Sequence, residues 1–160
     1  MDKYPAPRIA QDVPPAAKQT GYPEPFRSRV KGRIKRRLGD EFGLANFGVN
    51  LTTLAPGSLS SVRHGHTVQD EFIYVLEGHP TLVTNAGEMR LAPGMCAGFK
   101  AGVNDAHHIR NDTDEDVRYL EIGDRLPGDG AIYPDDDLVV RKIDGVYSYA
   151  HKDGTAYPLE

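Results

Sequence analysis

Two histidines and a glutamate stand close together near the middle of the chain. His64 and His66 are two residues apart, and Glu71 follows after four intervening residues. Successive side chains of a β-strand alternate between its faces, so both imidazoles point the same way if this stretch is extended. Imidazole nitrogens and a carboxylate that converge from neighbouring strands suit Fe, Mn, Zn or Ni. The spacing therefore predicts a site for one divalent transition metal.

A fourth candidate ligand, His107, lies further along the chain. Three histidines and one glutamate would leave a six-coordinate metal two positions for a chelating small molecule. Each histidine alone fits a surface or hydrogen-bonded position equally well, and the clustering is what favours a site. His108 is the alternative to His107, and Asp70 is the alternative to Glu71, because strand alternation admits only one of two neighbours to an interior.

The elements that must position these residues read as short strands. From residue 45 to residue 123, short apolar runs alternate with turns that contain glycine, proline or asparagine. This pattern indicates an all-β fold of the sandwich or barrel type, without helical periodicity and without a repeat of solenoid length. With Glu71 facing inward, alternation predicts that Ile73 and Val75 face the interior and Tyr74 faces outward.

The N-terminal residues 1–26 hold six of the twelve prolines. Proline fixes φ and removes a hydrogen-bond donor, so we expect an extended arm here. The arm is either a disordered tail or is pinned along the domain or a partner subunit by its apolar side chains, which are Tyr4, Ile9, Val13, Tyr22 and Phe26.

Residues 27–37 carry seven basic side chains, mostly at alternate positions around Val30 and Ile34. This is the period of a strand with one charged face. It is either a solvated edge strand or a surface for an acidic ligand or for the acidic segment 112–116. We expect the domain to span residues 27–150 and to end in a hairpin around Asp144 and Gly145, before a polar tail at 151–160.

Composition limits the classes of partner. The chain has 160 residues, enough for one domain with a core, and a net charge of −4, which argues against nucleic acid or an anionic membrane. It has no apolar run of transmembrane length and no signal-peptide core at its start. Cys96 is the single cysteine, so we expect no internal disulfide, a cytoplasmic setting and a small buried side chain.

The order of these residues resembles the two sequence motifs of the cupin superfamily. The first motif reads Gly57, His64, His66, Glu71 and Gly78, and the second reads Gly87, Pro93, His107 and Asn111. The resemblance covers residues 45–123 and implies a double-stranded β-helix, or jelly-roll barrel, with the metal held by His64, His66, Glu71 and His107. Within these motifs, the spacings to Asn111 and Gly78 favour His107 over His108 and Glu71 over Asp70.

Three departures from the family pattern concern turns. Six residues separate Gly57 from His64 where the family usually has five. Lys100 stands where a proline is common, and four residues separate Gly102 from His107, which lengthens the loop before that ligand. Arg63 and Lys100 flank ligands and could hold an anionic group, although either could equally be a solvated charge.

The flanks resemble a group of single-domain bacterial cupins, some of which are labelled sugar-phosphate isomerases. The resemblance implies a small oxygenated substrate, either a sugar phosphate or a carboxylate, and isomerisation assisted by the metal as a Lewis acid. The cupin fold hosts many reactions, so an Fe(II)-dependent dioxygenase and a non-enzymatic binding or sensor module are alternatives. Open sheet edges and the proline-rich arm predict a homodimer.

Overall fold

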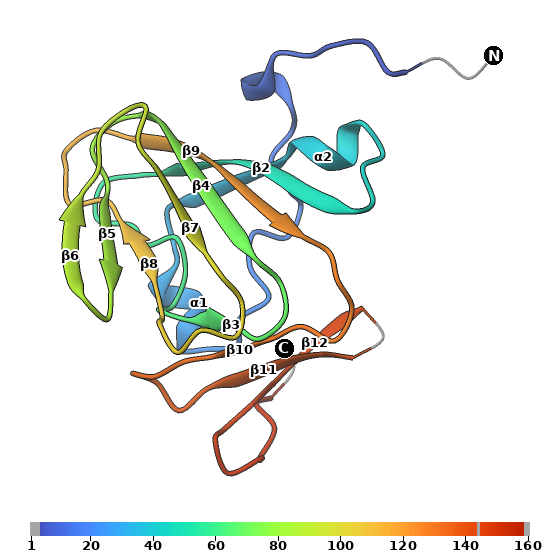
Figure 1. Ribbon diagram of the computed structural model, residues 1–160, viewed down its shortest axis with the longest axis vertical. Coiled ribbons are helices and arrows are strands. Elements are labelled where there is room, and N and C mark those ends of the chain that lie inside the picture. The colour runs from blue at the N-terminus through green and yellow to red at the C-terminus, as the bar shows by residue number, and fades with distance from the viewer. Residues whose placement is uncertain (1–3, 144, 159–160) are drawn as a thin grey trace.

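The computed structural model describes residues 4–143 and 145–158, and most of its regular secondary structure is antiparallel strand (Figure 1). The two α-helices have four residues each, so the expected all-β class is confirmed. None of the helices in these residues is long and apolar enough to cross a membrane. In chain order, the elements are η1 (Ala10–Asp12), α1 (Phe26–Arg29), β1 (Arg33–Arg37), α2 (Leu38–Glu41), β2 (Phe47–Leu54), β3 (Gly65–His66), β4 (Glu71–Glu77), β5 (Thr81–Thr84), β6 (Gly87–Arg90), β7 (Cys96–Phe99), β8 (His108–Arg110), β9 (Val117–Asp124), β10 (Gly130–Ile132), β11 (Val139–Ile143) and β12 (Val146–Ala150).

The strands form three sheets. The largest has the order β1-β2-β9-β4-β7, a second has the order β12-β11-β10-β3, and a third has the order β6-β5-β8. A core of buried side chains from β2, β4, β5, β8 and β9 joins the first sheet to the third. Neighbouring strands come from distant parts of the sequence, as a jelly-roll barrel requires.

The register of β4 and β9 decides what faces the interior of the barrel. Glu71 pairs with Gly123, Ile73 pairs with Glu121, and Val75 pairs with Tyr119. The apolar and aromatic side chains on this inner face are almost fully buried. Ile73 is 1% exposed, Val75 is 0% exposed and Tyr119 is 1% exposed. Burial of each aliphatic side chain stabilises the fold by about 1.5–3 kcal/mol. The predicted inward positions of Ile73 and Val75 are confirmed, and Tyr74 faces outward as expected.

A second core cluster lies between α1, the N-terminal arm and the sheet that contains β10 and β11. It includes Tyr22 and Phe26 from the arm, together with Val62, Tyr133 and Leu138. The proline-rich arm is thus pinned to the domain at its C-terminal end. Val13 is also buried, whereas Tyr4 and Ile9 are exposed.

Gly78 ends β4 in a conformation that requires glycine. Its φ is +78°, and a Cβ at this position would lie 2.6 Å from Cγ1 of Val117 and 3.0 Å from the carbonyl oxygen of Asp116. A side chain would therefore suffer both backbone strain and a clash with the core. This explains why the motif ends in glycine.

The basic segment 27–37 is only partly a strand. Residues 26–29 form α1, because Arg27 donates its backbone N–H to Pro23 and Val30 donates to Arg27, and the strand begins at Arg33 after Gly32 with a φ of +82°. The prediction of one continuous strand was wrong, because it used charge alternation and could not include these local bonds. Two ion pairs of the segment join it to distant acids, since Arg29 binds Asp136 and Lys35 binds Glu121, and Arg37 lies 3.9 Å from the nearby Asp40.

The structure also tests the predictions for Cys96 and for the C-terminal hairpin. Cys96 is exposed at the start of β7, so the expectation of a buried thiol was wrong. Alternation places it on the outer face of the sheet, opposite Tyr74. The C-terminal hairpin pairs β11 with β12 as predicted, although Asp144 in its turn lies outside the described residues.

Candidate metal centre

Strands β3 and β4 bring three of the predicted ligands together. Ligand atoms of His64, His66 and Glu71 all lie within 4.8 Å of one another. Nε2 of His66 is 3.2 Å from Nε2 of His64 and 3.5 Å from Oε2 of Glu71. His64 and His66 lie in and just before β3, whereas Glu71 begins β4 in another sheet, so the fold makes the sequence spacing a convergent set of donors.

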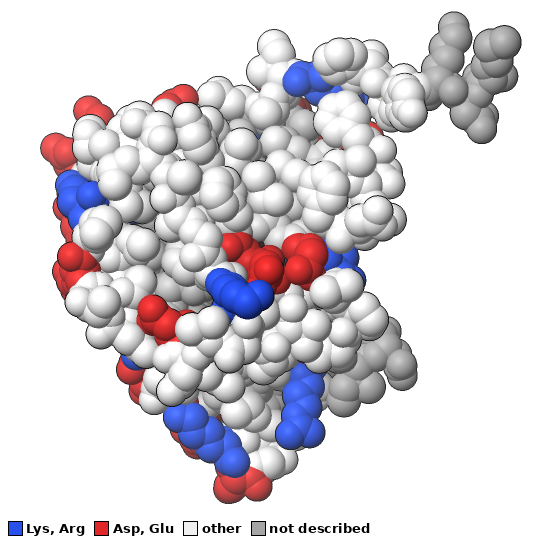
Figure 2. Space-filling model, viewed as in Figure 1, with Lys and Arg blue, Asp and Glu red and all other residues white. Residues whose placement is uncertain are grey.

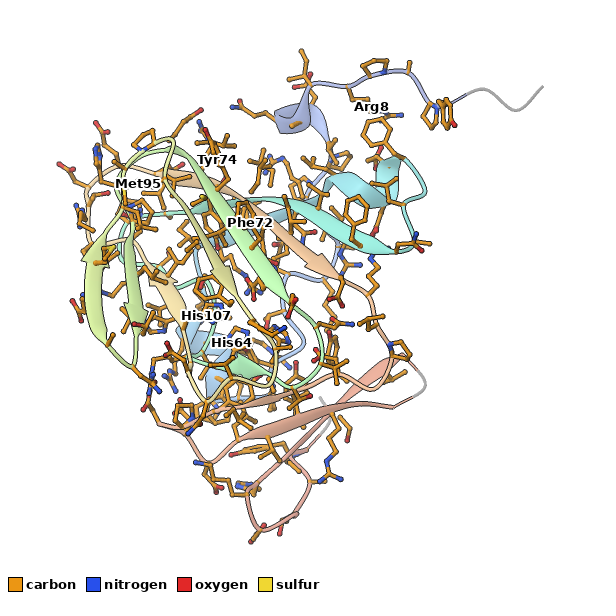
Figure 3. The ribbon with its side chains drawn as sticks, in the orientation of Figure 1. Arg8, His64, Phe72, Tyr74, Met95 and His107 are labelled. Carbon is orange, nitrogen blue, oxygen red and sulfur yellow. The ribbon has the colours of Figure 1, made fainter. Side chains whose placement is uncertain are left out.

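His107 joins this group from the segment that lies beside His64. Its Nε2 lies 3.4 Å from Oε2 of Glu71, and a backbone bridge pairs His107 with His64 (Figure 3). Its ring stacks on Phe99 with the centroids 3.5 Å apart, which fixes the plane of the imidazole. Nδ1 of His107 is buried without a hydrogen-bond partner among the described residues.

The two rejected neighbours have other roles. Asp70 is exposed, and its carboxylate accepts a hydrogen bond from the backbone N–H of Ala101 at 2.8 Å. His108 belongs to β8, where it pairs with Val83 in the third sheet. Asn111 is fully buried and donates to the carbonyl oxygens of Leu54 and Glu115, so it ties the strands together beside the site.

Hydrogen bonds fix which ring nitrogen of each histidine faces the cluster. Nδ1 of His64 donates to the carbonyl oxygen of Val62 at 2.9 Å, and Nδ1 of His66 lies 2.8 Å from Oδ2 of Asp129. With both Nδ1 hydrogens directed outward, each Nε2 presents a lone pair to the same point. The 3.2 Å between the two Nε2 atoms is bridged either by a proton or by a metal ion, and a set of two imidazole nitrogens and a carboxylate fits a divalent metal.

The pKa values of these groups agree with a site built for positive charge. Burial lowers the pKa of His64 to about 3, so its imidazole is neutral and able to bind a metal. Burial also opposes charge on His66, but hydrogen bonds to Asp129 and Glu71 outweigh it and raise the pKa to about 10. For Glu71, burial is likewise outweighed, by His107 and His66, and its pKa is held well below the usual range.

A cavity of about 550 Å³ opens on this cluster. His64, His66 and Glu71 contribute to its wall, which also includes residues from β1, β2, β9, β10 and β12. The wall carries four tyrosines and four Lys or Arg side chains. The tyrosines are Tyr22, Tyr133, Tyr147 and Tyr149, and the cations are Arg33, Lys35, Arg37 and Arg125.

The predicted anion contacts Arg63 and Lys100 are not among the residues that line this cavity. The guanidinium of Arg63 binds both carboxylate oxygens of Asp135, at 2.6 and 2.8 Å, and donates to Oδ1 of Asn85 at 2.6 Å. Alternation turns Arg63 away from its neighbour His64, so these bonds hold surface loops together. The prediction that either residue binds substrate has no support from the geometry.

Three polar residues around the cluster, Asp129, Lys35 and Glu121, were not predicted from the sequence as site residues. Asp129 supports His66 and also accepts the backbone N–H groups of Val68 and Gln69. Inside the barrel, Nζ of Lys35 lies 2.5 Å from Oε1 of Glu121. Glu121 could have been found from the sequence, because it is a charged residue within the apolar run of β9. No local pattern marks Asp129.

The chain is similar to known proteins in sequence and in structure. The model of the Cupin domain matches residues 50–123. A crystal structure of a sugar phosphate isomerase from a cupin superfamily, from Silicibacter pomeroyi, is 42% identical, with a TM-score of 0.83 and 88% of each chain covered. A proposed sugar phosphate isomerase from Acidithiobacillus ferrooxidans is 32% identical, with a TM-score of 0.71, 80% of this chain covered and 81% of that one.

More distant structures share the fold alone. The polyketide cyclase RemF from Streptomyces resistomycificus is 20% identical, with a TM-score of 0.61, 74% of this chain covered and 78% of that one. No curated protein matches the chain. The motif order, the jelly-roll topology and the similarity over most of the chain agree, and the protein belongs to the cupin superfamily.

Proposed function

We propose that this protein is a metal-dependent isomerase that acts on a small phosphorylated sugar. The observation that carries the proposal is that one cavity is lined both by the cluster of His64, His66 and Glu71 and by the ion pair of Lys35 and Glu121. The cavity volume of about 550 Å³ is in the range of small-molecule sites. The two solved relatives that are named for sugar phosphate isomerisation support the substrate class.

Isomerisation of a sugar needs a base as well as a polarised carbonyl group. A proton leaves the carbon that bears the hydroxyl group and is returned to the neighbouring carbonyl carbon, while a second proton moves between the two oxygens. We assign the proton transfer between the two carbons to the carboxylate of Glu121. Lys35 is the group that we assign to supply the proton to the carbonyl oxygen. Metal held by the histidines and Glu71 would supply Lewis-acid polarisation of the carbonyl group.

The strand register places this acid–base pair on the same inner face as the metal ligands. Glu121 pairs with Ile73 and therefore lies two positions along β9 from Gly123, the partner of Glu71. Diagonal neighbours of this kind are about 7–8 Å apart, a separation that a small substrate spans. Asn50 also donates to Oε1 of Glu121, at 3.3 Å, which helps to orient the carboxylate.

Arg37 is the cation that we assign to the phosphate group. It is the last residue of β1, and its side chain is 58% exposed and 3.9 Å from the carboxylate of Asp40. Alternation puts it on the same face as Lys35, one step closer to the mouth of the cavity. The assignment predicts that Arg37→Met raises KM for a phosphorylated sugar and leaves KM for the unphosphorylated sugar unchanged.

The test is an assay of metal-loaded protein against a panel of aldose and ketose phosphates, followed by NMR. We expect turnover of at least one pair, and a loss of at least about 100-fold in kcat for Glu121→Gln with the metal content unchanged. Glu115→Gln is the matched control, because Glu115 is exposed in the turn before β9 and distant from the cavity wall. Absence of turnover across the panel by fully loaded protein would contradict the proposal.

The same preparations distinguish the two alternatives for this site. An Fe(II) dioxygenase would consume oxygen in the presence of substrate, which an oxygen electrode detects. A binding or sensor module would retain a ligand through purification and release it unchanged on denaturation, which mass spectrometry detects. Isomerisation without oxygen uptake argues against the dioxygenase. Free exchange of the substrate argues against the binding or sensor module.

A further inference from the structure

One cation on the cavity wall has no acidic partner. Lys35 belongs to the acid–base pair, and Arg37 and Arg125 both lie beside the carboxylate of Asp40. Arg33 lines the same cavity, yet it forms no ion pair with any residue that the structure describes. Because a partly desolvated cation without a counter-ion is costly, an anion that enters the cavity gains most by binding there.

The guanidinium of Arg33 also keeps donors that the protein does not use. Its two terminal nitrogens donate to the carbonyl oxygens of Ser60 and Gln19, which fixes the orientation of the group. Nε of Arg33 is buried and has no hydrogen-bond partner among residues 4–143 and 145–158. A guanidinium has five N–H groups in one plane, so donors remain for a carboxylate or a phosphate.

The hydroxyl group of Tyr149 is a second available donor at the same end of the cavity. It forms no hydrogen bond within the described part of the chain, and a Cβ on Gly21 would lie 3.2 Å from its oxygen. Gly21 is two residues beyond Gln19, which accepts the bond from Arg33. Burial raises the pKa of Tyr149, and the positive charge of Arg33 opposes that rise, so the two groups are near each other. The phenol therefore stays protonated and can donate to an anion beside Arg33.

The inner face of β1 carries three cations in a row. Arg33 and Arg37 are four positions apart, or roughly 13 Å along the strand, and Lys35 lies between them. Exposure rises along the row, since Nε of Arg33 is buried, the side chain of Lys35 is 22% exposed and that of Arg37 is 58% exposed. Figure 2 shows acidic and basic side chains together near the middle of this face of the molecule, where the largest sheet meets the sheet of β10 to β12. The row thus leads from the interior of the cavity toward solvent.

We propose that Arg33 and Tyr149 bind a second anionic group of the substrate, so that the substrate carries one anion at each end. The inference rests on the proposed function, which assigns a phosphate group to Arg37. Sugar bisphosphates and phosphorylated sugar acids are the two classes with this chemistry. In an extended sugar of either class, the anions stand at opposite ends of the carbon chain and the reacting carbons lie between them, as Lys35 lies between the two arginines.

Calorimetric titration of the metal-loaded protein measures this preference. The probes are fructose 6-phosphate, which has a single anionic group, and fructose 1,6-bisphosphate and 6-phosphogluconate, which have a second one. We expect each probe of the second kind to bind about 10–100-fold more tightly, because it adds charge-assisted hydrogen bonds. The ratio of their affinities shows whether the inner site prefers phosphate or carboxylate. The phosphogluconate has no carbonyl group to isomerise, so it reports binding alone.

Substitutions assign the preference to the inner site. Arg33→Met should reduce the affinity for both two-anion probes to that of fructose 6-phosphate, whose own affinity should not change. Tyr149→Phe should remove about 3–10-fold of the preference and keep the ring against Tyr22. Arg36→Met is the matched control, because Arg36 lies on the outward face of β1 and donates to the carbonyl oxygen of Gln11 at 3.1 Å. Circular dichroism verifies folding. If Arg33→Met does not fold, Arg33→Lys, which lacks the planar fork, should lose the preference at least in part.

Every outcome decides the inference. Equal affinity for the three probes would overturn it, as would a preference that survives the substitutions at Arg33 and Tyr149. Failure of both two-anion probes to bind at about 1 mM would also overturn it. Isomerisation of monophosphates without the preference would refute the second anion site and leave the proposed function standing. A preference that requires Arg33, without turnover of any sugar phosphate, would uphold the site and contradict the proposed function.

Discussion

His64 and His66 present their Nε2 atoms to each other across 3.2 Å, while both Nδ1 atoms are engaged by groups behind the rings. Repulsion between the two lone pairs makes this geometry stable only when a cation occupies the gap. In metal-free protein a proton on His66 can fill that role, in agreement with its pKa of about 10. A metal ion that binds there must displace this proton.

Removal of one imidazole should abolish metal binding. We expect native protein to carry about one metal ion per chain and His66→Ala to carry almost none, because three remaining donors hold a divalent ion poorly. Elemental analysis by mass spectrometry measures the ratio. His79→Ala is the control, because His79 is exposed beyond the end of β4. Equal metal content in the two variants would exclude His66 as a ligand.

Asp129 should matter for metal affinity although it lies behind a ligand. Asp129→Asn keeps an oxygen for the backbone N–H groups of Val68 and Gln69 but removes the charge that holds the His66 ring. We expect affinity to fall about 10–100-fold, as measured by competition with a chelating dye. Asp114→Asn, in an exposed turn, should leave it unchanged. An unaltered affinity in Asp129→Asn would show that the hydrogen bond does not support the site.

Arg63 should act on stability and not on substrate affinity. Its guanidinium holds the pKa of Asp135 below the usual range. A carboxyl group with a lowered folded-state pKa stabilises the fold above its unfolded value near 3.9, and this contribution is lost as the pH falls through the folded value. Arg63→Met should therefore cost about 0.5–1 kcal/mol at pH 7 and less near pH 2–3, since Asp135 is half exposed.

Urea unfolding at both pH values measures the effect of Arg63→Met. In the native protein, the hydrogen bonds of Arg63 to neutral groups persist in acid, whereas its ion pair with Asp135 does not. The part of the stability loss that depends on pH therefore reports the ion pair. KM should be unchanged, because Arg63 does not line the cavity. A raised KM with unchanged stability would restore the role in substrate binding that its position beside His64 first indicated.

A pair of glycines separates steric clash from backbone strain. Gly78 and Gly57 have φ values of +78° and +75°, but a Cβ on Gly57 would meet nothing within 4 Å. Both alanine variants bear the same conformational cost of about 1 kcal/mol, and Gly78→Ala should lose about 1–3 kcal/mol more from its clash with Val117. Thermal unfolding measures the difference. Equal losses would mean that the β4–β9 corner relaxes around the new methyl group.

The local part of the metal site could be predicted from sequence because two elementary patterns place it. Alternation in a strand puts His64 and His66 on one face, and the same rule turns Ile73 inward and Tyr74 outward. His107 depended on a family motif rather than on spacing alone. The jelly-roll fold also depended on it, since short strands with frequent turns are equally compatible with several all-β folds.

The rest of the site arises from pairing between distant strands. Lys35 meets Glu121 because β1 and β9 both flank β2, and Asp129 meets His66 because β10 pairs with β3. No rule of local periodicity contains these neighbours. The helical turn at 26–29 was missed because charge alternation does not include the local backbone bonds that form it. The exposure of Cys96 was missed because residue type alone does not state what packs against a segment.

The cavity wall comes from two kinds of segment. The candidate metal ligands belong to the part of the chain that matches the family model, whereas Lys35, Arg37 and the four tyrosines lie outside residues 50–123. We therefore expect that substitutions in the flanks change the lining of the cavity and leave the cluster of His64, His66 and Glu71 in place. This division makes the protein a natural scaffold for chimeras, in which the flanks of one relative are grafted onto the barrel of another to transfer substrate choice.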